Sequence, residues 1–286
     1  MLKINIIGKE KQAEIPSNWQ ELTSEQIIFI YKEYFYLLKH GNFPLFYDRL
    51  LCKFMPQCKK KVVFFKDNKH VNASEIANII FAYLWTYDGK NLHFTYNEIQ
   101  NHLPKFSVNN KNFYGPKDLL FDLTFEEFQA ALTAQNEFFD GDKTAIDKFL
   151  YSLYRCSDKG KRAEYNPDFP TEKLKIYKKI HEWQAAMIMH WFSNCINYIQ
   201  KGDIVVNGKT VNFSCLFPKK VEEEKKKNTL GWQSIIFDFA KDGIFGNVRQ
   251  TEKQKLFDIL ILMLDYYNKN EEMKKEYAKL NSKHKK

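Results

Sequence analysis

Arginine is scarce in this chain. Only four of its 44 basic residues are arginine: Arg49, Arg155, Arg162 and Arg249. Recognition of phosphates and base edges favours the bidentate guanidinium group, so a nucleic acid is not expected as the main partner despite a net charge of +9. Residues 273–286 hold six lysines and one glutamate, and therefore five of these nine excess charges. We expect most other lysines to be solvated surface residues.

Cysteine pairs and long apolar runs are also missing. The five cysteines are an odd number without a C-x-x-C pair, which is typical of a reducing compartment. The longest apolar runs are residues 185–192 and 257–264, interrupted by His190 and Asp258, and both are far shorter than the roughly 18 residues of a membrane span. The first eight residues are too short and polar for a secretory signal. We expect a soluble intracellular protein with no membrane partner.

Two short strings resemble known ligand loops but lack the necessary residues. Gly208-Lys209-Thr210 ends like a phosphate-binding loop, yet position 203 is Asp instead of glycine, and Asn207-Gly208 is typical of a hairpin turn. Asp140-Gly141-Asp142 is not followed by the further oxygen ligands of a cation loop. We interpret it as a turn between helices.

Recognisable catalytic signatures are absent from the sequence. No G-x-S-x-G or H-E-x-x-H motif occurs. His181 and His190 are nine residues apart, which places them on opposite faces of one helix, so they cannot bind the same metal ion. We expect His190 to be a hydrogen-bonded core residue. The sequence predicts a non-enzymatic protein with no catalytic residues, metal site or cofactor, and a hydrolase built from distant residues is the alternative.

Aromatic residues, by contrast, are abundant. The chain has 25 Phe, 16 Tyr and 5 Trp, enough to fill a large core. Aromatics at helical spacing, such as Phe29, Tyr36 and Phe128, are expected to be core residues. The other aromatic residues are more than single helix faces can bury, and an excess of aromatic side chains is typical of a protein-binding surface. The candidate partner-binding residues are Trp19, Tyr31, Tyr34, Phe35, Phe138, Phe139, Trp232, Tyr266 and Tyr267.

One phrase occurs twice, about a hundred residues apart. Residues 21–26 read ELTSEQ, and residues 122–127 read DLTFEE. In each, the threonine can cap the first free amides of a helix while the glutamine or glutamate three residues later reaches back, which is a capping box. Each predicted helix leads through a short break to a second amphipathic segment, ending near residue 51 or residue 154. The sequence therefore predicts a duplicated helical hairpin.

Further elements follow from turn and capping signals. We predict β-hairpins within residues 2–15, 61–71 and 203–213, the last turning at Asn207-Gly208. Predicted helices cover residues 45–55, 72–85, 171–201 without a break and 231–241, with a short helix from Thr95 and a last helix capped by Thr251 and Gln254 that ends near Tyr267. Predicted linkers are residues 107–116 and 218–228.

Together these signals predict a mainly α fold. We expect a helical bundle with duplicated helical hairpins and two or three small β-hairpins. The predicted segments are an N-terminal helical repeat (1–110), a second repeat with a long central helix (111–218), a C-terminal helical pair (229–272) and a basic tail (273–286).

Several short strings resemble uncharacterised proteins from phage and prophage tail regions. They are residues 15–23 (IPSNWQELT), 113–116 (FYGP) leading into 123–128 (LTFEEF), 150–155 (LYSLYR), 231–232 (GW), 245–246 (FG) and 251–252 (TE). By gene-region analogy, such proteins lie near tail-assembly chaperones, which shield the tape-measure protein before the tail tube polymerises. The resemblance implies a chaperone-like protein in the cytoplasm of a bacterial host.

Three hypotheses follow. The leading one is a phage or prophage protein that binds another phage protein, such as the tape-measure protein, during tail assembly. The second is a structural virion component, such as a connector or tail-completion subunit. The third is nucleic-acid binding through the basic tail, with affinity that falls steeply with salt. Self-association is left open as well. The tail residues for the third hypothesis are Lys274, Lys275, Lys279, Lys283, Lys285 and Lys286.

Overall fold

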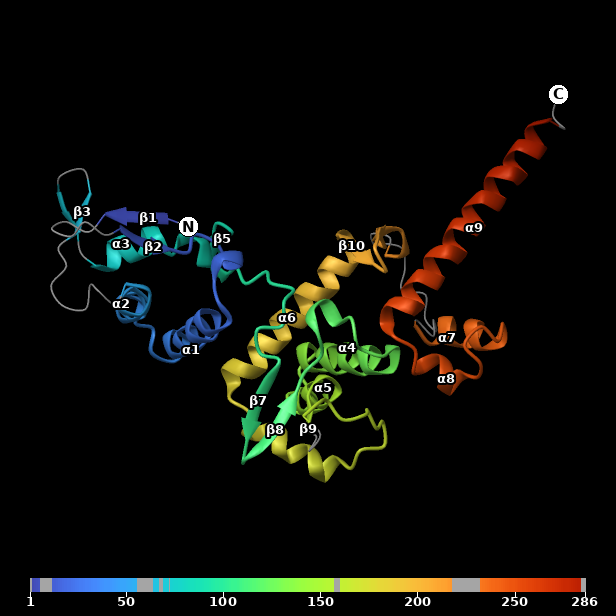
Figure 1. Cartoon of the computed structure of the whole chain (residues 1–286), viewed down its shortest axis with the longest axis horizontal. Coiled ribbons are helices and arrows are strands. Elements are labelled where there is room, and N and C mark those ends of the chain that lie inside the picture. The colour runs from blue at the N-terminus through green and yellow to red at the C-terminus, as the bar shows by residue number, and fades with distance from the viewer. Residues whose placement is uncertain are drawn as a thin grey trace. The chain divides into compact units, whose positions relative to one another are not determined.

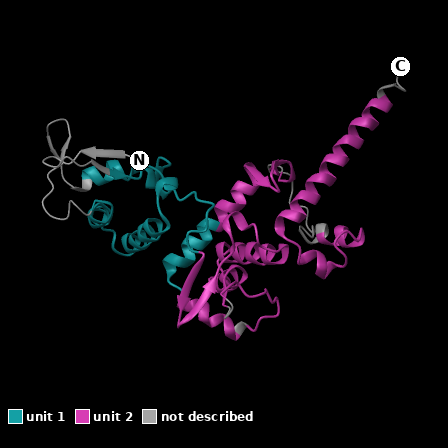
Figure 2. Ribbon diagram, in the orientation of Figure 1, with its two compact units in different colours: residues 1–103, 180–191 teal, residues 104–179, 192–286 magenta. Residues whose placement is uncertain are grey.

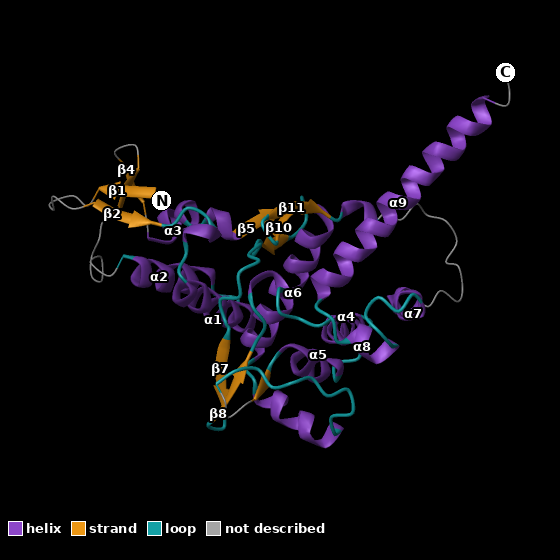
Figure 3. Ribbon diagram, turned by 45° about the vertical axis from the view of Figure 1, so that its right-hand side comes forward, coloured by secondary structure: helices purple, strands orange, loops and turns teal. Residues whose placement is uncertain are grey.

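A computed structural model describes residues 2–5, 12–55, 64–66, 69–71, 73–156, 160–217 and 232–283. These residues are mainly helical with small antiparallel sheets, as the sequence predicts (Figure 3). They form two compact units, one of residues 1–103 and 180–191 and the other of residues 104–179 and 192–286 (Figure 2). Unlike the consecutive segments expected from the sequence, both units are discontinuous, because the long helix α6 contributes residues to each.

Some expected features lie outside the described residues. They are the turns at Gly8-Lys9 and Asp67-Asn68, the linker 218–228 and Cys58. Among the helices that the structure describes, none combines the length and apolar character of a membrane span.

The described residues of unit 1 form helices and three two-stranded sheets (Figure 1). Two of the sheets, β1–β2 and β3–β4, lie within predicted hairpins, and β5–β6 was not predicted. In chain order the elements are β1 (Leu2–Asn5), β2 (Gln12–Ile15), the 3-10 helix η1 (Trp19–Glu21), α1 (Ser24–His40), α2 (Phe43–Phe54), β3 (Phe64–Lys66), β4 (Lys69–Val71), α3 (Ala73–Ile80), the 3-10 helix η3 (Ala82–Leu84), β5 (Trp85–Tyr87), β6 (Leu92–Phe94) and the first half of α6 (Glu182–Lys201).

Helix α1 begins with the predicted capping box. The Thr23 hydroxyl accepts from the Gln26 amide at 3.3 Å, and the Gln26 side chain accepts from the Thr23 amide at 2.8 Å. The helix ends where Gly41 adopts a left-handed conformation with φ 66°, and Asn42 then caps α2. The amides of Thr23 and Gln26 are therefore satisfied by side chains that the sequence identifies.

The core of unit 1 is aromatic. Trp19 and Tyr31 are buried and contact Phe94 and Tyr96 in edge-on geometry, with ring centroids 5.1–5.3 Å apart. Trp191, in the first half of α6, donates its indole N–H to the Ile99 carbonyl at 2.8 Å. The long loop before residue 103 is thus fixed by ring packing and by a buried hydrogen bond.

Two helix predictions in unit 1 are wrong. The helix expected over residues 72–85 ends at Ile80, and Trp85 begins strand β5. No helix starts at Thr95, because its hydroxyl donates to the Tyr83 carbonyl and its amide to the Leu84 carbonyl. Thr95 thus binds the segment that follows β6 to the 3-10 helix η3 instead of capping a new helix.

Unit 2 holds the second capped helix pair and the C-terminal helices. In chain order its elements are β7 (Lys105–Val108), β8 (Lys111–Tyr114), the 3-10 helix η4 (Asp118–Leu120), α4 (Phe125–Phe139), α5 (Ala145–Leu153), β9 (Arg155–Cys156), the 3-10 helix η5 (Thr171–Lys179), the second half of α6, β10 (Asp203–Val206), β11 (Lys209–Asn212), the 3-10 helix η6 (Ser214–Leu216), α7 (Trp232–Lys241), α8 (Val248–Glu252) and α9 (Leu256–Lys283).

The repeated phrase again forms a capping box at the start of α4. Thr124 and Glu127 exchange side-chain hydrogen bonds with each other's amides at 2.8 and 3.2 Å. Helix α4 ends at Phe139, and Gly141 with φ 113° allows the turn before α5, as predicted. Helices α4 and α5 pack together, and Phe128 and Phe149 contact Phe192 of α6.

Two turns in unit 2 depend on left-handed residues. Strands β10 and β11 turn at Asn207 (φ 50°) and Gly208 (φ 77°), which confirms the predicted hairpin. Residues 107–116, by contrast, are not a linker. They hold most of the hairpin β7–β8, which turns at Asn109 and Asn110 with φ 49° and 60°. Asparagine tolerates this conformation, so an Asn-Asn pair can replace Asn-Gly.

Three helix boundaries in unit 2 differ from the predictions. The helix expected over 171–201 is interrupted, because residues 171–179 form a 3-10 helix and α6 starts at Glu182. Thr251 does not cap the last helix. It is buried within α8, whose own capping box pairs Asn247 with Gln250. Helix α9 then continues to Lys283, well beyond Tyr267.

Candidate partner-binding surface

Four of the candidate aromatics lie in unit 1. Trp19 and Tyr31 are 3% and 0% exposed, so they are core residues and the prediction of an exposed contact is wrong for them. Tyr34 and Phe35 are half-buried. The Tyr34 ring stacks on Phe94, with ring centroids 4.3 Å apart, and is therefore largely used within the unit.

His190 in unit 1 accounts for one hydrogen bond of the core. Its Nδ1 lies 2.8 Å from the Tyr31 hydroxyl, which confirms that the histidine is hydrogen-bonded. The residue nevertheless keeps an exposed side, so it lines the edge of the core instead of its centre.

The other candidate aromatics belong to unit 2. Phe138 is half-buried beneath the Lys143 ammonium, whereas Phe139 is 65% exposed at the end of α4. Tyr266 and Tyr267 lie on α9. The side chain of Trp232 is outside the described residues. The candidates of unit 2 whose side chains are described thus fall into two groups, one at the end of α4 and one on α9.

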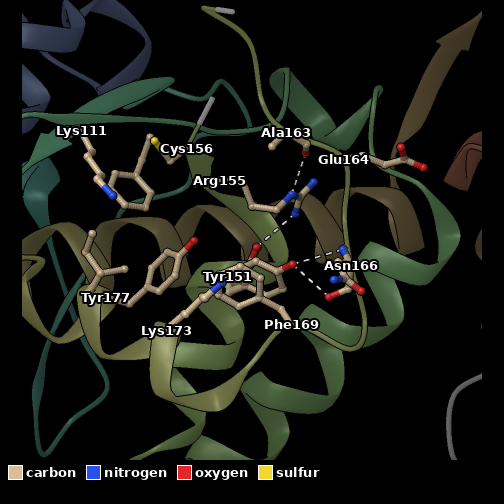
Figure 4. Close-up of a pocket in the computed structure, with 12 residues that line it drawn as sticks. Lys111, Tyr151, Arg155, Cys156, Ala163, Glu164, Asn166, Phe169, Lys173 and Tyr177 are labelled. Carbon is tan, nitrogen blue, oxygen red and sulfur yellow. Dashed lines mark hydrogen bonds between the residues drawn. The ribbon is translucent and has the colours of Figure 1, made fainter. Parts of the chain in front are cut away.

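A pocket of about 580 Å³ lies beside α5 and η5 (Figure 4). Its walls include Tyr151, Phe169 and Tyr177, and the Tyr151 ring stacks on Phe169 with centroids 4.4 Å apart. The Tyr151 hydroxyl donates to the Asn166 carbonyl at 2.9 Å and accepts from the Asn166 amide at 3.2 Å. These hydrogen bonds hold the loop before η5 against α5, so the hydroxyl has a structural role.

Arg155 forms the polar wall of the same pocket. Its guanidinium donates to Glu127 and to the Ala163, Tyr151 and Ser152 carbonyls, the last at 2.6 Å. Burial lowers the pKa of Arg155, and the adjacent carboxylate opposes that shift. Because the arginine side chain is only 4% exposed and its donors are used internally, this wall serves the fold.

A serine, a histidine and a glutamate meet near the start of α1. Ser24 Oγ lies 3.0 Å from His102 Nδ1, and His102 Nε2 lies 3.8 Å from Glu98 Oε2. A nucleophilic serine requires a base that a third group holds at hydrogen-bond distance, about 2.6–3.2 Å. The 3.8 Å separation does not meet that requirement. The buried His102 side chain instead attaches the loop before residue 103 to α1.

Helix α9 has a buried and an exposed part. Leu256, Phe257, Ile259 and Leu260 are at most 3% exposed, whereas the helix extends away from the other elements of its unit toward the C-terminus (Figure 1). The exposed part still carries large apolar side chains. Met273, Tyr277 and Leu280 are 49%, 66% and 53% exposed.

These side chains continue a regular pattern. Alternating steps of three and four residues connect eight positions of α9, here called the α9 stripe, and seven of them are apolar or aromatic. Such spacing puts side chains on one face of a helix and is typical of a helix that packs along another helix. The α9 stripe consists of Leu256, Ile259, Met263, Tyr266, Asn270, Met273, Tyr277 and Leu280.

The middle of the α9 stripe opens into a second pocket, of about 490 Å³. Met263, Tyr266 and Asn270 line it from α9, and Phe239 lines it from α7. Phe239 stacks on Tyr266 with centroids 5.6 Å apart, and the Tyr266 hydroxyl donates to Asp242 at 2.7 Å. The exposed apolar residues are therefore continuous with a hollow that is lined by aromatic rings.

The tail lysines are interleaved with acidic residues. Lys274, Lys275 and Lys279 are exposed on α9, but Lys274 pairs with Glu271 at 2.7 Å. The side chains of Lys283, Lys285 and Lys286 are outside the described residues. The described part of the tail is thus a helix of mixed charge instead of a uniformly basic segment.

Within the described ranges, no group of three or more His, Cys, Asp or Glu side chains could hold a metal ion. Searches of protein-family models, curated proteins and solved structures found no match to the chain. The surface on α9 is therefore interpreted from its own geometry.

The α9 stripe was missed at the sequence level although its spacing is visible there. Ending the last helix near Tyr267 separates Tyr266 from Met273, Tyr277 and Leu280, so the regular steps are lost. Extending the predicted helix through the polar residues 268–272 would have joined Tyr266 to these three residues in one pattern.

Proposed function

We propose that this chain acts by binding another protein during assembly of a phage tail. The binding surface is the exposed part of the α9 stripe together with the adjoining pocket. In this role the chain holds an apolar segment of its partner away from aggregation until assembly uses it.

The observation that carries the proposal is the exposure of Met273, Tyr277 and Leu280 on one face of α9. Apolar side chains that continue in register beyond the folded body contribute nothing to its core, and contiguous exposed apolar residues are typical of interaction sites. The adjoining pocket supplies the concave, aromatic-lined surface in which binding energy concentrates.

The tail-assembly context rests on the strings that resemble phage and prophage tail-region proteins. The same proposal includes the framework of the binding surface: the duplicated capped helix pairs form a helical bundle that presents α9. The tape-measure protein is the partner that this context implies, and the host cytoplasm is where binding would occur.

The test is capture of partners by the tagged full-length chain from cells that produce the phage, with mass spectrometry of purified particles in parallel. We expect a long helical tail polypeptide in the captured fraction and no copies of this chain in particles. Stoichiometric presence in particles would instead make it a structural virion component. Normal tail formation after deletion of the gene would also overturn the proposal.

A further inference from the structure

The geometry points to an amphipathic helix with acidic flanks as the partner of the exposed part of the α9 stripe. This inference rests on the proposed function and names the chemistry of the segment that is bound. It follows from three features: the spacing of the stripe, the charges beside it and one polar position within it.

The spacing selects a helix as the occupant. Asn270, Met273, Tyr277 and Leu280 are separated by three, four and three residues, so they form one narrow row along the helix. A row of this kind is matched by a second helix whose apolar side chains repeat with the same spacing. The pocket beside Met263 and Tyr266 accepts a further apolar side chain at the end of that helix.

The charges beside the row select acidic flanks. Lys269 and Glu276 lie on one side of the row and Lys274 lies on the other, so two of these three charges are positive. The Lys269 and Lys274 side chains are 66% and 74% exposed. Among the described residues, each forms an ion pair with a neighbour on the same helix, Lys269 with Asp265 at 2.6 Å and Lys274 with Glu271 at 2.7 Å. Such exposed pairs contribute little free energy, so both ammonium groups remain able to attract carboxylates from a partner. Residues that flank the apolar row of paired helices select the partner by charge.

The same charges disfavour a second copy of this chain. A parallel pair in register brings Lys269 of one copy opposite Lys274 of the other. An antiparallel pair that overlaps Met273 with Tyr277 brings the two copies of Lys274 together. Like charges in these positions oppose association, whereas glutamates in a different partner would favour it.

Asn270 sets the register of the bound helix. It is exposed and interrupts the apolar row between Tyr266 and Met273. Burying its amide against an apolar side chain leaves hydrogen-bond groups unsatisfied, whereas a polar residue opposite satisfies them. The bound segment is therefore expected to carry one polar residue, such as asparagine, at the matching position of its apolar row.

The experiment uses the full-length chain and two synthetic helical peptides of about four heptads. Both have leucine and isoleucine in the apolar row and one asparagine. One peptide carries glutamate, and the other lysine, at the flanking positions that face Lys269 and Lys274. Fluorescence anisotropy should show the acidic peptide binding at least tenfold more tightly than the basic one. Raising the salt concentration should reduce that difference.

A charge-swapped chain provides the matched control. The variant Lys269→Glu/Lys274→Glu leaves the apolar row intact and should reverse the preference, so that the basic peptide binds more tightly. The exchange Asn270→Leu should weaken discrimination against a peptide without the asparagine. Equal binding of both peptides, or an acidic preference that persists in the charge-swapped chain, would refute the inference.

Two further measurements separate this inference from the proposed function. A dimer in sedimentation equilibrium at micromolar concentration, abolished by Tyr277→Ser, would replace the acidic helix with a second copy. If the chain still captures a tail polypeptide from phage-producing cells but binds neither peptide, the proposed function stands and the assignment of the partner's chemistry fails.

Discussion

Helices α1 and α4 begin with the same capping box but differ in what surrounds it. Gln26, the third residue of α1, is partly exposed and bonds to Thr23 alone among the contacts described. Glu127, the third residue of α4, is 4% exposed and contacts Arg155 and Arg162 as well as Thr124. A capping motif identifies a helix start, but the residue within it can also become part of a buried charge cluster.

The difference extends to the second residue of each helix. Glu25 of α1 pairs with Lys53 at the surface, and the hydrogen bond from that lysine lowers the pKa of Glu25. Glu126 of α4 is partly buried, and this burial raises the pKa of its carboxyl group. Equivalent positions in the repeated phrase therefore have opposite electrostatic roles.

The largest effect is expected from exchanging the third residues. Glu127→Gln keeps the shape and the hydrogen bond to Thr124 but leaves the buried Arg155 without its carboxylate. We expect a loss of about 3 kcal/mol in the free energy of unfolding, which is the lower end of the range for breaking a buried pair. The loss is limited because Arg162, the second arginine beside Glu127, keeps Asp122 at 3.5 Å. Urea denaturation measures it.

The matched exchange in α1 is Gln26→Glu. This position is outside any buried charge cluster, so the change should stay within about 0.5 kcal/mol. Similar losses for both exchanges would show that the contrast between the two helix starts is wrong.

Replacing the capping threonines should give intermediate and similar effects. Thr23→Ala and Thr124→Ala each remove one side-chain acceptor from the first turn, which costs about 1 kcal/mol. Chemical denaturation of both variants tests whether the caps themselves are equivalent. A loss above about 3 kcal/mol for Thr124→Ala alone would mean that its hydroxyl also supports the charge cluster.

A smaller effect should appear in the pH dependence. Because the pKa of Glu126 is raised by folding, its contribution to stability is present below its unfolded pKa and is lost as pH rises through its folded pKa. Because the pKa of Glu25 is lowered, its contribution is present above its unfolded pKa and is lost as pH falls through its folded pKa.

Substitution with glutamine separates the two carboxyl groups. Glu126→Gln should therefore stabilise the protein at pH 7 and lose that advantage at pH 4, whereas Glu25→Gln should slightly destabilise it at pH 7. Unfolding curves at both pH values measure these changes, and NMR titration gives the order of the two pKa values directly. A higher pKa for Glu25 than for Glu126 would contradict the assignment.

Local signals account for much of the fold. The threonines at 23 and 124, Asn207-Gly208 and Gly141 act through adjacent backbone groups, so the sequence alone identifies their caps and turns. The predictions failed where hydrogen bonds to residues distant in the sequence determine the local structure. Thr95 could cap a helix, but the carbonyls of Tyr83 and Leu84 take its hydrogen bonds instead.

The candidate site was predicted in part. Aromatic excess indicated Tyr266 and Tyr267, which line the pocket beside α9. The same criterion also selected Trp19 and Tyr31, because composition alone does not distinguish a buried ring from an exposed one. The α9 stripe was not predicted, because the last helix was expected to end near Tyr267 and the polar residues 268–272 separate Tyr266 from Met273.

The smallest expected change in stability belongs to the region that we propose for binding. Replacing Met273, Tyr277 and Leu280 together by serine should leave the unfolding of the body unchanged, since these side chains are exposed. The control replaces Glu272, Lys275 and Lys279 by serine, which changes helix propensity to a similar extent on other faces of α9.

Parallel capture from phage-producing cells with the wild-type chain and these two variants tests the central claim most directly. We predict that the serine variant of the α9 stripe loses the tail polypeptide while its thermal unfolding matches that of the control, and that the control retains the polypeptide. Undiminished capture by the stripe variant, or equal loss in both variants, would contradict binding through this face of α9.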